Sequence, residues 1–106
     1  MSKVVVVLCT FPNHETAENV ARAVVGEELA ACANLVNGVR SIYRWEGEVR
    51  DDAEVLGMFK TTDIGFSALE RRLAELHPYE CPEIIATDVN HGHTPYLEWV
   101  RASVAG

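Results

Sequence analysis

The chain has 106 residues and a mass of 11.7 kDa, which is enough for one hydrophobic core, so we expect a single domain over residues 1–106. Sixteen acidic residues against nine Lys and Arg give a formal net charge of −7, and this charge disfavours nucleic acids and anionic membrane surfaces as partners. The longest apolar run, Val4 to Cys9, is far shorter than the ~20 residues that cross a bilayer, and no small-residue cleavage site follows it, so we expect a cytoplasmic protein.

The first 30 residues predict a strand followed by a helix. Val4 to Leu8 are apolar on both faces of an extended chain, which is typical of a central strand. After Pro12, Asn13 is a good helix cap, and apolar residues then recur every three or four positions. We expect this helix to end near Leu29 or Ala30.

A long hairpin follows the first helix. Residues 31–36 predict a strand that continues over 39–45 after a bulge at Asn37-Gly38. Glu46-Gly47-Glu48 predicts the turn, and a return strand runs to Thr62. The charged residues 50–52 leave the start of that return strand undefined.

The last third of the chain predicts helix, strand and helix. Asp63 is expected to open a helix that Pro78 ends. Ile84 to Val89 predict a fourth strand. Thr94 and Pro95 suit the cap and first position of a last helix.

The order βαββαβ with one added helix indicates an α+β, ferredoxin-like sandwich. Right-handed crossovers place both main helices on one sheet face, and the other face stays bare although the first strand is apolar there too. We therefore expect that face to meet another subunit. In this topology Cys9 lies near the start of the fourth strand and near the loop that begins at His77. His91 and His93 lie at the opposite edge of the sheet.

Five segments, VVVVLCTFPNHETA, EELAACANLVNGVRSIYRWEGEV, FKTT, LHPYECPEI and YLEWV, resemble the CutA family, named for divalent cation tolerance, in the same order over nearly the whole chain. The resemblance implies a homotrimer whose hairpins pair between subunits, and a role in tolerance of copper and other divalent metals. It also implies copper binding by the cysteine of LCT and the histidine before PY, which are Cys9 and His77. Leu76 stands where some members of the family have a second histidine.

Thiolate and imidazole are ligands that copper prefers, but two ligands do not close a site. Glu80, Cys81, Glu83 or a neighbouring subunit could supply further donors. The alternative interpretation is structural, with Cys9 a buried small hydrophobe and His77 a helix-end residue stabilised by the carbonyl dipoles. The three cysteines are odd in number and form no CxxC pair, so we expect free thiols, with Cys32 in the core.

Other candidates carry less weight. The imidazoles of His91 and His93, which flank Gly92, could share a metal ion, although a strand-to-helix loop with a glycine is commonly just solvated. Tyr43, Trp45 and Glu46 could line a ligand pocket, or simply pack across the hairpin.

We expect no enzyme, because neither GxSxG nor HExxH occurs. A cysteine hydrolase using Cys9 and His77 would lack an identifiable third residue. The main alternative function is a P-II-like trimeric signalling protein that binds a small metabolite between subunits, an idea that rests on fold analogy.

Overall fold

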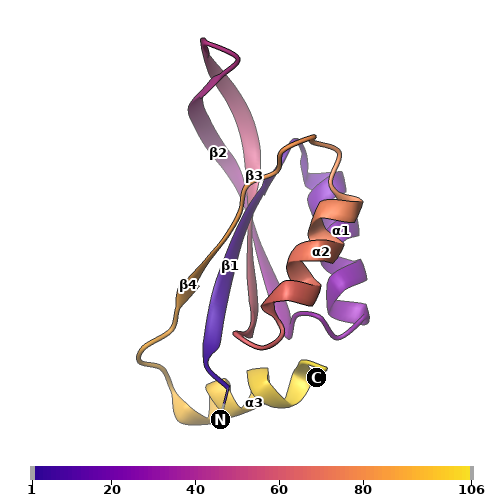
Figure 1. The fold of residues 1–106 in the computed structure, drawn as a ribbon, viewed down its shortest axis with the longest axis vertical. Coiled ribbons are helices and arrows are strands. Elements are labelled where there is room, and N and C mark those ends of the chain that lie inside the picture. The colour runs from indigo at the N-terminus through magenta and orange to yellow at the C-terminus, as the bar shows by residue number, and fades with distance from the viewer. Residues whose placement is uncertain (1, 106) are drawn as a thin grey trace.

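A computed structural model describes residues 2–105 as one sheet with three helices (Figure 1). The elements in chain order are β1 (Val4–Phe11), α1 (His14–Gly26), β2 (Cys32–Trp45), β3 (Glu48–Thr62), α2 (Phe66–Leu76), β4 (Ile84–Asp88) and α3 (Thr94–Ser103).

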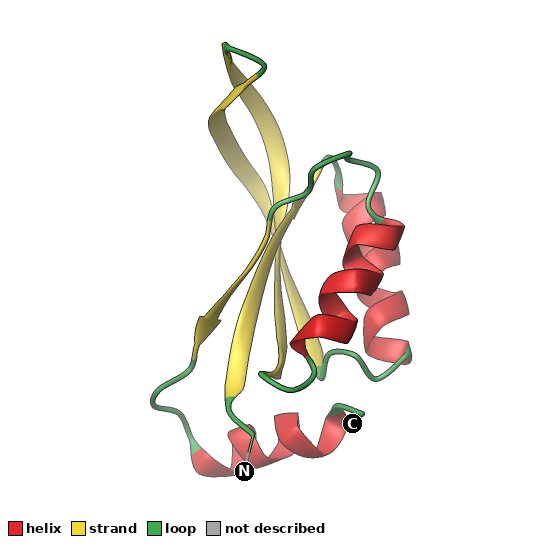
Figure 2. Ribbon diagram, in the orientation of Figure 1, coloured by secondary structure: helices red, strands yellow, loops and turns green. Residues whose placement is uncertain are grey.

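The four strands form an antiparallel sheet in the order β2-β3-β1-β4, with the apolar β1 at a central position. Helices α1 and α2 lie side by side on one face, and α3 lies across the end of the sheet where β1 begins (Figure 2). The expected α+β, ferredoxin-like arrangement with an added C-terminal helix is confirmed.

Helix α1 begins as the sequence predicts, because the Asn13 side chain accepts a hydrogen bond from the Thr16 backbone nitrogen at 2.8 Å. It ends at Gly26, so the expected end near Leu29 or Ala30 is wrong. Glu28 has a φ of 62°, a left-handed conformation that a continuing helix does not allow. Leu29 still packs against the core, but from a loop.

The hairpin agrees closely with the prediction. Strand β2 is continuous, with a register shift between Val36 and Val39 that marks the expected bulge. Glu46 and Gly47 both have positive φ, 51° and 79°, as two-residue hairpin turns require. The tip of the β2-β3 hairpin projects well beyond the helices (Figure 1).

Three further element boundaries differ from the expectation. Helix α2 begins at Phe66 rather than Asp63, whose carboxylate accepts hydrogen bonds from the backbone nitrogens of Lys3 and Ile64 in the turn before the helix. Strand β4 ends at Asp88, before the expected Val89. Thr94 is the first residue of α3 rather than its cap, which is His93.

The main core fills the space between the sheet and the helices α1 and α2. Its largest fully buried side chains include Phe11, Phe59, Leu69 and Leu73. On the other face, Val6 and Leu8 of β1 are only half-buried, next to Leu56 and Met58 of β3. We call these four residues the open face.

Candidate functional site

Cys9 lies near the end of β1 and faces the helices. It is fully buried, and its neighbours across the sheet are Gly57 of β3 and Ile84 of β4. The start of β4 is therefore beside Cys9, as the topology predicts.

Burial, together with the nearby carboxylates of Glu83 and Glu54, raises the pKa of the Cys9 thiol to about 12. A thiolate loses its hydration in the core, and two negative charges oppose its formation further. At neutral pH Cys9 is a protonated thiol. Any cation bound by its sulfur must displace that proton.

His77 is the C-cap residue directly after helix α2 and is buried, with 8% of its surface exposed. Its ring stacks on Phe11 with a centroid distance of 5.0 Å. The Nε2 atom lies 2.7 Å from the Thr10 carbonyl oxygen, and Nδ1 lies 3.1 Å from the Tyr79 backbone nitrogen. Because a carbonyl can only accept and a backbone N–H can only donate, Nε2 carries the proton and Nδ1 the lone pair.

The Thr10 carbonyl brings the two predicted site residues together. Its oxygen accepts the His77 Nε2–H, and the Cys9 sulfur lies 4.0 Å from the same atom. A thiol and an imidazole from distant parts of the sequence thus lie beside the same backbone oxygen at the end of β1.

Two residues that the sequence did not single out surround this pair. The Tyr79 hydroxyl donates to Glu54 Oε2 at 2.7 Å, and the Tyr79 ring lies 4.7 Å from the His77 ring. Glu54 is 8% exposed although it is charged. The signal that could have found it is an acidic residue directly before the apolar part of the return strand.

Further donors are not assembled around Cys9 and His77. Glu80, Cys81 and Glu83 are all exposed, and of these Glu83 is near enough to affect the pKa of Cys9. Within residues 2–105, no three His, Cys, Asp or Glu side chains form a group that could hold a metal ion.

The other candidate residues lie elsewhere. His91 and His93 are exposed at the opposite end of β4, as expected. Tyr43, Trp45 and Glu46 are exposed in the projecting hairpin, where the Tyr43 hydroxyl donates to Asp52 at 2.6 Å.

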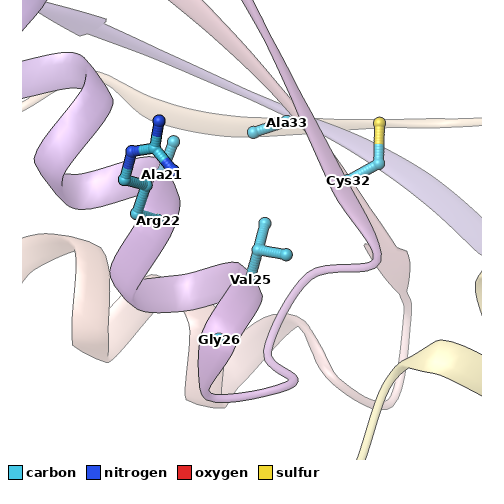
Figure 3. A pocket seen from close by; sticks show the side chains of 6 residues that line it. All are labelled: Ala21, Arg22, Val25, Gly26, Cys32 and Ala33. Atoms are coloured by element: carbon cyan, nitrogen blue, oxygen red, sulfur yellow. The ribbon is translucent and has the colours of Figure 1, made fainter.

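Cys32 is not in the core, which corrects the expectation. It is half-buried, and its sulfur accepts hydrogen bonds from Lys60 Nζ at 3.8 Å and the Tyr96 hydroxyl at 3.9 Å. Cys32 borders a hollow of about 500 Å³ between α1 and β2, but the Cys32 sulfur points away from α1 (Figure 3). The hollow is open and has a largely apolar lining, with Arg22 at its edge.

Comparison with known proteins decides the family. The model of the family described as CutA1 divalent ion tolerance protein matches residues 5–103. The chain belongs to the CutA1 family. Its CutA1 relatives include the divalent-cation tolerance protein CutA of Thermus thermophilus, 50% identical over 91% of this chain and 93% of the relative. The CutA of Escherichia coli K12 is 46% identical over 94% of this chain and 89% of the relative.

Solved CutA1 structures have the same fold. The Thermus thermophilus protein superposes with a TM-score of 0.94 and 47% identity, covering 96% of this chain and 99% of that one. CutA1 from Oryza sativa gives 0.94 at 40% identity, covering 97% and 94%. A CutA from Archaeoglobus fulgidus described as periplasmic gives 0.92 at 27% identity, covering 96% and 99%.

The family match favours a role in divalent metal tolerance over the P-II-like alternative, and CutA1 is not a family named for catalysis. None of the helices described between residues 2 and 105 is long and apolar enough to cross a membrane.

Proposed function

We propose that this CutA1-family chain is a cytoplasmic homotrimer that binds copper, and also other divalent cations, through Cys9 and His77 in metal tolerance. The ion is cargo and takes part in no reaction, so the chain is not an enzyme. The observation that carries the proposal is the meeting of the Cys9 thiol and the His77 imidazole at the Thr10 carbonyl. Soft sulfur with imidazole nitrogen is a donor set that favours copper over magnesium or calcium.

Metal binding requires a change in this site, because the Cys9 sulfur carries a proton and both nitrogens of His77 are engaged in hydrogen bonds. Cys9 must lose its proton from a thiol whose pKa is about 12, and His77 must free a nitrogen lone pair. Copper therefore competes with protons, and its affinity should rise with pH. Glu83 and a second subunit are the available sources of further donors.

The trimer is supported by the open face. Val6, Leu8, Leu56 and Met58 form an apolar patch at the centre of the sheet, and Ile85 of β4 beside them is 54% exposed. Isolated domains rarely leave such a patch in water. The cytoplasmic location is supported by three cysteines that form no disulfide within the described residues.

A copper titration followed by calorimetry tests the binding proposal. Cys9→Ser removes the soft ligand and His77→Ala the imidazole, so each should weaken binding about ten-fold or more. The double variant should lose little beyond the worse single variant, because one remaining ligand cannot hold the ion. His91→Ala and His93→Ala are the controls. If the controls abolish binding while Cys9→Ser and His77→Ala bind like the wild type, the proposed site is wrong.

A further inference from the structure

His77 has no free nitrogen in this structure. The Nε2–H donates to the Thr10 carbonyl at 2.7 Å, and the Nδ1 lone pair accepts the Tyr79 backbone N–H at 3.1 Å. These two bonds fix one neutral tautomer.

Metal binding by either nitrogen of His77 breaks the hydrogen bond from the Tyr79 backbone N–H to Nδ1. If Nδ1 is the ligand, its lone pair goes to the ion, and the Tyr79 N–H loses its acceptor. If Nε2 is the ligand, the ring proton moves to Nδ1, and Nδ1–H would then face the Tyr79 N–H donor to donor. The Tyr79 backbone therefore has to move away from the imidazole in both cases.

The side chain of Tyr79 holds that backbone in place. Its hydroxyl donates to Glu54 Oε2 at 2.7 Å, a hydrogen bond to a charged and largely buried acceptor, and such bonds are stronger than neutral ones. Its ring lies 4.7 Å from the His77 ring, so the residue also covers the imidazole from outside. Tyr79 itself is 37% exposed, which leaves it room to swing outward.

We propose that Tyr79 is a latch on His77: while its hydroxyl is bound to Glu54, its backbone N–H occupies the imidazole and delays metal binding, and its release opens the ligand. The proposal rests on the proposed function, since it states how the metal reaches His77. It makes Tyr79 a positioning residue rather than a ligand.

Tyr79→Phe tests the latch because it removes only the hydroxyl that reaches Glu54. Copper association followed by stopped-flow absorbance should become about ten-fold faster in this variant, the factor that loss of one such hydrogen bond supplies. The sulfur-to-copper absorption band should keep its wavelength, because the ligands are unchanged. Tyr96→Phe is the matched control, since it removes a tyrosine hydroxyl on α3 that touches Cys32 and not His77.

A second readout does not depend on copper. Diethyl pyrocarbonate acylates a free imidazole lone pair, and peptide mapping gives its rate at each histidine separately. His77 should react faster in Tyr79→Phe than in the wild type. The rates at the exposed His91 and His93 should not differ between the variant and the wild type.

The outcomes separate the two proposals. Faster acylation of His77 without copper binding at Cys9 would support the latch and reject the proposed function. Copper binding through Cys9 in the wild type, with neither rate changed in Tyr79→Phe, would overturn the latch and leave the proposed function intact. A lower melting temperature with both rates unchanged would show that Tyr79 only stabilises the fold, and would overturn the latch as well.

Discussion

The Cys9 thiol links the stability of the fold to alkaline pH. Its pKa in the folded chain, about 12, lies above the ordinary value of 9.0, so the native state holds this proton more tightly than the unfolded state does. The resulting stabilisation is complete below pH 9 and is lost as the pH rises to about 12. At the steepest point, the unfolding equilibrium constant should change about ten-fold per pH unit through this one group.

As the pH rises from 9 to 12, the free energy of unfolding should fall less for Cys9→Ala than for the wild type. Urea denaturation at each pH measures this free energy. Cys81→Ala is the matched control, because Cys81 is an exposed thiol. If the free energy of unfolding changed equally with pH in Cys9→Ala and the wild type, Cys9 would not be the buried acid we describe.

At the residue scale, the sequence predicted that Cys9 and His77 lie at the same edge of the sheet, because the strand order brings the end of β1 to the start of β4 and to the loop that precedes it. It could not predict that Thr10 would be their common partner, since a backbone carbonyl leaves no mark in the sequence. It also missed Glu54, whose buried carboxylate accepts a hydrogen bond from the Tyr79 hydroxyl in a loop 25 positions away.

At the scale of elements, a glycine fixes how closely β1 and β3 pack beneath the helices. A Cβ on Gly57 would lie 2.7 Å from a Phe59 ring carbon and 3.0 Å from one of Phe11, and both rings are fully buried. Gly57→Ala should cost about 1–3 kcal/mol of unfolding free energy, the usual range for overpacking.

Gly26→Ala provides the contrast. Gly26 is the last residue of α1, and no atom lies within 4 Å of an added Cβ. This substitution should stabilise the protein by about 0.4–1 kcal/mol, because alanine restricts the unfolded chain. Thermal denaturation of both variants measures the two effects, and a destabilised Gly26→Ala or a neutral Gly57→Ala would contradict this packing.

Predictability also differed between elements. The bulge and the turn of the hairpin were predicted, because the turn needs residues that tolerate positive φ, but the start of β3 at Glu48 was left undefined by the charged residues 50–52. The end of α1 was not predicted, because apolar spacing continues past Gly26 into a loop where Leu29 reaches the same core.

At the scale of the whole molecule, the open face should hold the trimer together. Met58→Glu places a charge at the centre of that face and should convert the trimer to monomers in light scattering at micromolar concentration. Ile64→Glu is the control, since Ile64 is 69% exposed in the turn before α2, off the sheet. Circular dichroism shows whether Met58→Glu remains folded. A wild-type monomer, or a Met58→Glu trimer as stable as the wild type, would contradict the proposed assembly.

The ligand set of the bound ion is the most direct test of the proposed function. X-ray absorption at the copper edge of the loaded protein reports which elements surround the metal. We predict a shell with one sulfur and at least one imidazole nitrogen, and loss of the sulfur in Cys9→Ser. A shell of nitrogen and oxygen alone in the wild type would contradict copper binding by Cys9 and His77.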